Sequence, residues 1–291
     1  GYSRRGYTFL GWSTDSDETS ERYTNQASIS TLSSTDGGVV DLFAIWQRNT
    51  YTITFNANGG SGTTSSLSML YNNGNYTLPK SGYSKAGYVF EGWTTNLDGT
   101  GTFYKDGATV NSYDFVANTI LYAKWRATWI TSASSSILGS GTQSNPYIIS
   151  KAEDLAYLAK QVQNGNTYSS GSTREYFEQT APINLTGKIW LPIGGNSLGE
   201  ATTAFGGVYN GRGFAIIGLE TYNQTDASGN QLYNNVGLFG RTNGARLVDI
   251  NISNAKIYGK TNVGALIGEN YGKPLEMYGC FARGEINGST N

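Results

Sequence analysis

Two stretches of the chain are nearly identical, and this duplication constrains the fold more than any other feature. Residues 1–14 read GYSRRGYTFLGWST and residues 82–95 read GYSKAGYVFEGWTT, with nine of fourteen positions the same. Each is followed by a polar stretch and then by a closing strand, LFAIW at 42–46 or LYAKW at 121–125. Because a whole unit recurs and the first copy starts halfway through it, we expect part of a tandem array, an architecture that presents surface more often than it catalyses.

The complete unit, from about residue 50 to residue 125, has the pattern of a small β domain. Tyr51, Ile53 and Phe55 alternate with polar residues, which predicts a half-buried strand that ends in a turn at Asn58-Gly59. The composition agrees, since 39 Gly, 21 Tyr and only 14% charged residues favour short strands joined by tight turns. We therefore predict a mainly β protein.

The order YTITFNANGG, GYVFEGW, LYAKW resembles the internalin B-repeat family. These are small β-grasp (ubiquitin-like) modules of the Listeria-Bacteroides type, strung along bacterial surface proteins. The resemblance implies a partial β-grasp module over residues 1–47 and a complete one over residues 48–126. It implies a fold and a surface location, and it carries over no catalytic residue.

The tryptophans of the two copies have two interpretations. Trp12 and Trp46 in the first copy match Trp93 and Trp125 in the second, and this recurrence favours core packing, because a core must be repeated whereas a binding site need not. Aromatic side chains on a small β domain also form carbohydrate-stacking or protein-binding surfaces. Trp12, Trp93 and Trp125 are therefore candidates for binding.

A second region follows a Ser- and Gly-rich stretch, residues 127–145, which we interpret as a linker or lead-in strand. Ser150 and Glu153 have the spacing of a capping box, apolar residues then follow at helical spacing, and Gly165 supplies a stop. This pattern predicts a helix over about residues 151–163.

Beyond the helix, a shorter period appears. VGLFG at 236–240 and VGALIG at 263–268 are 27 residues apart, and each precedes a turn and an alternating strand, at 247–252 or at 275–280. A unit of this length is too short to bury a core alone, so it must stack on its neighbours as one rung of a β-solenoid. Rungs of this kind would pair about 4.8 Å apart.

The segments NPYIISKAEDLAYLA, INLTGKIWLPIG, GVYNGRGFAIIG and VGLFG resemble the GLUG-motif β-helix regions of bacterial surface proteins. The resemblance implies a right-handed parallel β-helix over residues 146–291. The helix at 151–163 would then cap its N-terminal end and hide an exposed strand edge. Since the chain stops just after a strand-and-turn pattern, we expect the β-helix to continue in the parent protein.

Several chemistries are absent from the sequence. No histidine is present, which removes the Ser-His-Asp triad and the HExxH zinc site, and Cys280 is the one cysteine, so neither a disulfide nor a Cys-based metal site can form. A formal net charge of -1 without a basic run argues against a nucleic-acid partner. No apolar stretch approaches the ~20 residues of a membrane span. We therefore expect no metal, no cofactor and no membrane insertion within the chain.

Carboxylates are the remaining candidates for catalysis. Asp249 and Glu276 are 27 residues apart, so they would sit on adjacent rungs and could approach the roughly 5 to 9.5 Å that acid/base chemistry on a glycosidic bond needs. The simpler interpretation makes both solvated residues of alternating strands. We interpret Glu200, Glu220 and Asp226 as surface charges of loops or rung ends.

These observations lead us to expect a non-enzymatic, extracellular segment of a protein on the bacterial cell surface or in the cell wall. In this hypothesis the β-grasp repeats are spacers and the β-helix is a scaffold for adhesion to a host or bacterial surface protein or glycan. The alternative is a carbohydrate-active β-helix, either a polysaccharide lyase or a glycosidase, with the repeats as glycan-binding modules.

Overall fold

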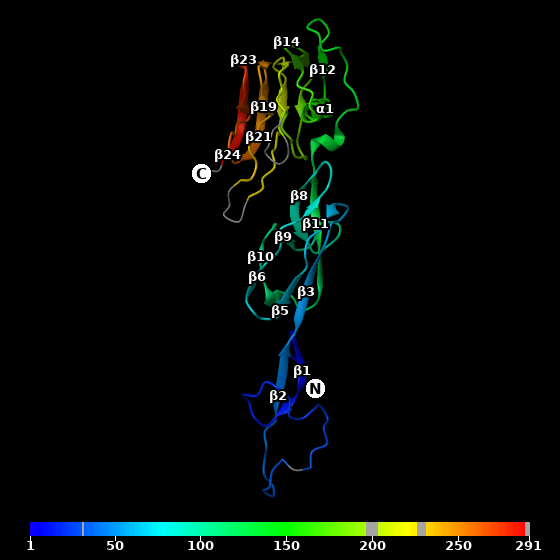
Figure 1. Cartoon of the computed structure of the whole chain (residues 1–291), viewed down its shortest axis with the longest axis vertical. Helices are drawn as coiled ribbons and strands as arrows, with labels where there is room; N and C mark the ends of the chain where they lie inside the picture. Colours follow the sequence, from blue (N-terminus) through cyan, green and yellow to red (C-terminus); the bar gives the residue numbers. More distant parts are fainter. Residues whose placement is uncertain (31, 196–202, 226–230, 289–291) are drawn as a thin grey trace. The chain divides into compact units, whose positions relative to one another are not determined.

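The computed structural model describes residues 1–30, 32–195, 203–225 and 231–288, and they are mainly β (Figure 1), which confirms the predicted class. The chain divides into two compact units, Gly1–Tyr83 with Gly92–Lys124, and Ser84–Glu91 with Trp125–Asn291. This division falls within three strands, β7, β8 and β11. The domain boundaries expected at residues 47, 126 and 145 stay predictions.

The N-terminal part of the chain is built from short strands. They are β1 (Tyr7–Ser13), β2 (Phe43–Arg48), β3 (Thr50–Asn56), β4 (Ser61–Gly62), β5 (Leu67–Leu70), β6 (Asn75–Thr77), β7 (Tyr83–Ser84), β8 (Tyr88–Thr94), β9 (Phe103–Tyr104), β10 (Thr109–Asn111) and β11 (Thr119–Ala127). A 3-10 helix, η1 (Ser112–Asp114), precedes β11.

The main sheet of the complete copy has the strand order β5-β3-β11-β8-β9, and the pairs β10-β6 and β4-β7 form two further small sheets. β3 pairs with β11 in parallel and with β5 antiparallel, while β8 and β9 form an antiparallel pair. The partial copy contributes the antiparallel pair β1 and β2. The two copies match in detail, because Trp12 bridges Tyr23 as Trp93 pairs with Tyr104.

The core of the complete copy is aromatic and aliphatic. Ile53 lies on β3, as the alternation predicted, and is 1% exposed, while Trp93 and Leu121 are fully buried. The Trp93 ring packs 4.6 Å from Phe55 and 5.9 Å from Tyr83, measured between centroids. Asn58 and Gly59, with φ of 46° and 82°, form the predicted turn after β3.

In its described residues, the second unit contains one α-helix and short strands, most of which pair in parallel. After η2 (Trp129–Ser132) the elements are β12 (Tyr147–Ile149), α1 (Ala152–Gln163), β13 (Ser169–Ser170), β14 (Thr173–Arg174), β15 (Tyr176–Gln179), β16 (Ile183–Asn184), β17 (Val208–Asn210), β18 (Ala215–Ile217), β19 (Phe239–Thr242), β20 (Arg246–Val248), β21 (Asn251–Gly259), β22 (Ile267–Asn270), β23 (Glu276–Tyr278) and β24 (Phe281–Gly288).

Three parallel sheets organise this unit. Their strand orders are β12-β15-β17-β20-β23, β16-β18-β21-β24 and β19-β22, and neighbouring strands within them are parallel. The sequence distance between partners is 27 residues where Val236 meets Val263, 28 where Phe239 meets Ile267, and 30 where Arg246 meets Glu276. The 27-residue period expected from the sequence therefore holds where Val236 pairs with Val263, and the sequence distance between partners is longer at the other two pairs.

Rows of apolar side chains run through the parallel sheets. Phe177, Tyr209 and Leu247 lie in register on successive strands, and each is at most 1% exposed. Ile183, Ile216 and Ile252 form a second such row and are fully buried. Burying side chains of this size contributes about 1.5–3 kcal/mol each, so these rows hold the unit together.

The alternating strand expected at 247–252 is divided between two sheets, and the one expected at 275–280 ends early, at Tyr278. β20 ends at Val248, and the chain turns at Asp249 (φ 49°) before β21 begins in a different sheet. Gly279 (φ 61°) makes the equivalent turn between β23 and β24. A left-handed residue inside an apolar alternation breaks the strand, and the alternation alone does not reveal it.

The helix α1 begins and ends as predicted, but its N-terminus differs from the expected capping box. Ser150 donates from both its backbone N–H and its hydroxyl to Oδ2 of Asp154, at 3.1 and 2.9 Å, and no side-chain bond to Glu153 is involved. Asp154 also accepts from the Ser134 hydroxyl at 2.7 Å. Because Asp154 is only 6% exposed, its carboxylate joins the start of the helix to the segment after η2.

Candidate functional site

The three candidate tryptophans lie in different surroundings. Trp93 is fully buried, which leaves no ring face for a ligand. Trp12 and Trp125 are partly exposed, and each packs edge-on against a phenylalanine, with centroids 5.2 Å from Phe9 and 5.5 Å from Phe90. Both therefore combine an internal aromatic contact with an accessible part of the ring.

The two candidate carboxylates do not lie opposite each other. Because the register of β20 and β23 is 30 residues, Glu276 lies opposite Arg246, and Asp249 is an exposed residue at the turn that follows β20. Glu276 forms ion pairs with Arg174 at 2.8 Å and Arg246 at 3.8 Å. Their role as an acid/base pair stays a prediction.

Glu220 is more than a surface charge. Arg126 donates to both of its carboxylate oxygens, at 2.9 and 2.7 Å, and this bidentate hydrogen bond raises the pKa of Arg126. Glu91 lies 4.0 Å from the same guanidinium. The two other acidic residues considered from the sequence, Glu200 and Asp226, lie outside the described residues.

Glu276 lines a hollow of about 420 Å³ on the second unit. Its other walls are the hairpin 169–174 and the loops at Gly206, Asn243–Gly244 and Lys273–Pro274. In the hairpin, β13 and β14 pair antiparallel across Gly171-Ser172, and Gly171 has the positive φ (60°) that two-residue hairpin turns require. We call this space the Arg174 hollow.

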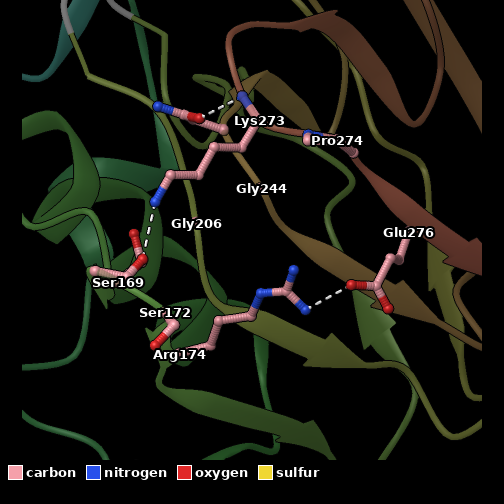
Figure 2. A pocket seen from close by; sticks show the side chains of 10 residues that line it. Ser169, Ser172, Arg174, Gly206, Gly244, Lys273, Pro274 and Glu276 are labelled. Carbon is pink, nitrogen blue, oxygen red and sulfur yellow. Dashed lines mark hydrogen bonds and ion pairs between the residues drawn. The ribbon is translucent and has the colours of Figure 1, made fainter.

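Two cationic side chains extend across the Arg174 hollow in opposite directions (Figure 2). Lys273 reaches the hairpin, where its ammonium donates to the Gly171 carbonyl at 2.8 Å. Arg174 extends from the hairpin to Glu276, to which its guanidinium donates at 2.8 Å. Each contact joins residues 102 positions apart in the sequence, so the hairpin is tied to the β22–β23 connection.

Neutral polar groups complete the lining. Ser169 and Ser172 bring hydroxyl groups, and the Asn243 side chain accepts from the Lys273 backbone N–H at 2.9 Å. A wall of guanidinium, ammonium, hydroxyl and amide groups can hold an anionic, hydroxyl-rich ligand. Among the residues that line it, Glu276 is the one carboxylate that the structure describes, so the hollow itself does not supply a pair of acids.

Sequence reasoning found Glu276 but missed Arg174 and Lys273. The available signal was the hairpin pattern SSGSTR at 169–174, which predicts a tight turn but not what it faces.

The described residues contain no group of three or more His, Cys, Asp or Glu side chains placed to hold a metal ion. Within that same part of the chain, none of the helices has the length and apolar character needed to span a membrane.

These features define a mainly β protein that is built from repeats and carries a polar hollow on its second unit. The family model of the Listeria-Bacteroides repeat domain matches residues 2–36 and 51–124, the region of the partial and complete copies. The internalin-type resemblance of these residues is therefore supported. The GLUG-type resemblance of the second region has no such support.

Two curated proteins are similar to part of the chain. A "Putative Gly-rich membrane protein" of Evansella cellulosilytica is 31% identical over 125 residues, 42% of this chain and 14% of the relative. Halomucin of Haloquadratum walsbyi is 29% identical over 135 residues, 46% of this chain and 1% of the relative. The chain thus spans a small part of these relatives, and no solved structure is significantly similar to it.

Proposed function

We propose that the chain is a non-enzymatic segment of a protein on the bacterial cell surface. In this proposal the β-grasp repeats are spacers, and the second unit is a scaffold that attaches to a surface protein or glycan. The match of residues 2–36 and 51–124 to a repeat domain is the observation that carries it. The names of the two relatives, a putative Gly-rich membrane protein and a halomucin, favour the same setting.

We further propose that the second unit is a right-handed β-helix capped by α1. The parallel pairing in three sheets and the buried rows along them support the solenoid. Support for the cap comes from the apolar face of α1, where Leu155, Leu158 and Val162 are fully buried in the same core as Phe177. A cap in this position would protect the edge of β12, the first strand of its sheet.

The surface location is tested by treating intact cells that produce the parent protein with a protease. We expect peptides from this chain to be released while the cells remain intact. Release only after lysis would contradict an extracellular location. A cytosolic protein followed in the same samples is the control for leakage.

The adhesive role is tested by incubating the purified chain with a panel of polysaccharides and surface proteins. We expect retention on at least one of them without release of new reducing ends. The alternative, a polysaccharide lyase or glycosidase that uses Asp249 and Glu276, predicts release of reducing ends or unsaturated products, and their loss in Glu276→Gln. Such release would replace the non-enzymatic proposal.

A further inference from the structure

The Arg174 hollow already contains the geometry of carboxylate recognition. Arg174 holds one oxygen of Glu276 at 2.8 Å, and Arg246 approaches the other oxygen at 3.8 Å. The bond to Glu276 uses one N–H donor of Arg174, whereas a guanidinium has five in a planar fork that suits carboxylates. The site is thus arranged around a carboxylate, with positive charge in excess of the single acid.

The second cation lies on the opposite side of the same space. The Lys273 ammonium is anchored at the Gly171 carbonyl, across the hollow from the contact between Arg174 and Glu276 (Figure 2). An ammonium has three donors, and the bond to Gly171 uses one of them. An anionic ligand between Arg174 and Lys273 would therefore be met by positive charge from both sides.

The remaining lining favours a hydroxylated ligand over a peptide. Ser169, Ser172 and Asn243 bring hydroxyl and amide groups, which exchange hydrogen bonds with sugar hydroxyls. Protein partners are held mainly by aromatic and other large anchors in desolvated pockets, and Pro274 is the one apolar side chain of more than a methyl group among the described lining residues. A volume of about 420 Å³ is within the usual range of small-ligand sites.

We propose that the Arg174 hollow binds a saccharide that bears carboxylate groups, of the uronic-acid class. This inference rests on the proposed adhesive function and names the class of glycan for it. Arg174 and Lys273 bind the carboxylates of the ligand, and the Ser and Asn side chains bind its hydroxyl groups. The lining loops are neighbours, because a Cβ on Gly206 would lie 3.0 Å from the Asn243 carbonyl oxygen and the Gly244 N–H donates to the Lys273 carbonyl at 3.3 Å.

The experiment measures binding of the whole chain to polygalacturonate, with dextran as the neutral polymer and dextran sulfate as a polyanion without carboxylates. We expect affinity for polygalacturonate well above that for either comparison polymer. Arg174→Gln and Lys273→Gln should each weaken binding about tenfold, because each removes a charge-assisted contact. Arg212→Gln is the matched control, since Arg212 is exposed on the same unit and pairs with Glu178 at 3.7 Å, outside the hollow.

Glu276→Gln should change the affinity for polygalacturonate in the opposite direction. In the wild-type chain Glu276 occupies Arg174 and Arg246, so its carboxylate competes with that of the ligand. Removing the charge should tighten polygalacturonate binding several-fold. If these side chains only supported the fold, then Arg174→Gln, Lys273→Gln and Glu276→Gln would all weaken binding. Thermal unfolding of each variant checks that its fold is intact.

Three outcomes overturn the inference. They are equal binding of dextran sulfate and polygalacturonate, equal loss in Arg212→Gln and Arg174→Gln, and no binding of polygalacturonate. If the chain then binds a neutral glycan or a surface protein, the adhesive proposal survives without this site. If the chain binds nothing on the panel, the adhesive proposal fails as well.

Discussion

At the residue scale, the glycines before Trp12 and Trp93 have a steric explanation. A Cβ on Gly11 would lie 2.5 Å from the Tyr23 carbonyl oxygen, and a Cβ on Gly92 would lie 2.5 Å from that of Tyr104. In both copies the next residue, Trp12 or Trp93, pairs with that tyrosine. The strand pairing that places the tryptophan therefore requires the glycine.

We predict that Gly92→Ala destabilises the first unit by about 2–4 kcal/mol, because it adds a backbone clash to a φ of 149° that L-residues rarely adopt. Gly74→Ala is the control, since Gly74 also has a positive φ (83°) but has open space at its Cβ position. Urea unfolding followed by tryptophan fluorescence measures both. Equal costs for the two variants would show that the clash contributes nothing.

Asp106 predicts a pH effect on stability. Burial raises its pKa above the usual value, against a smaller lowering by the Ser81 backbone N–H, which donates at 2.8 Å, and by Lys80. The folded state therefore binds the proton more tightly than the unfolded state, and the protonated carboxyl stabilises the fold at low pH. This stabilisation is lost as the pH rises from about 3.9 through the folded pKa.

Asp106→Asn should remove this loss while keeping an oxygen that can accept from Ser81. We therefore expect the unfolding free energy of the Asn variant, relative to that of the wild type, to be higher at pH 7 than at pH 3. Unfolding free energies at several pH values measure the difference between the two proteins. A difference that is independent of pH, or that has the opposite sign, would refute the assigned shift.

At the element scale, the start of α1 depends on a carboxylate that the sequence pattern did not indicate. The S-x-x-E spacing pointed to Glu153, whereas the structure gives the contacts to Asp154, which accepts from Ser134 and twice from Ser150. One residue along a helix rotates a side chain by about 100°, so the buried side of the helix rather than the motif decides which acid is used.

Two matched substitutions test this assignment. We predict that Asp154→Ala costs about 2–3 kcal/mol, because it removes a buried carboxylate that accepts charge-assisted hydrogen bonds and leaves their donors without it. Glu153→Ala should change stability by less than about 0.5 kcal/mol, as is usual for a residue without such contacts. Chemical denaturation of the second unit, followed by circular dichroism, measures both. A larger cost for Glu153→Ala would restore the capping box.

The same elements show what the sequence could predict. The alternation at Tyr51–Phe55 and the helical spacing of α1 are local patterns, and both elements form where they were expected. The division of 247–252 into two strands depends on a left-handed turn at Asp249. An aspartate at that position does not by itself predict such a turn. The Arg174 hollow depends on contacts over 102 residues, which no local pattern encodes.

At the scale of the whole molecule, the rows inside the second unit change exposure at the last described strands. Leu247 is fully buried, but Met277, its partner in register, is 50% exposed. Ile257 is fully buried, but its partner Ile286 is 53% exposed. Positions that a neighbouring strand covers elsewhere in the unit are thus open on β23 and β24, so we expect their side chains to stabilise the unit less than their partners in register.

Ile257 and Ile286 allow this difference to be tested with the same substitution. We predict that Ile257→Ala costs about 2–5 kcal/mol in the unfolding free energy of the second unit, because it leaves a cavity in a closed row. Ile286→Ala should cost less than about 1 kcal/mol in the same chain, since its side chain is already half in water. Equal costs for the two variants would contradict the weaker contribution expected of the exposed strand β24.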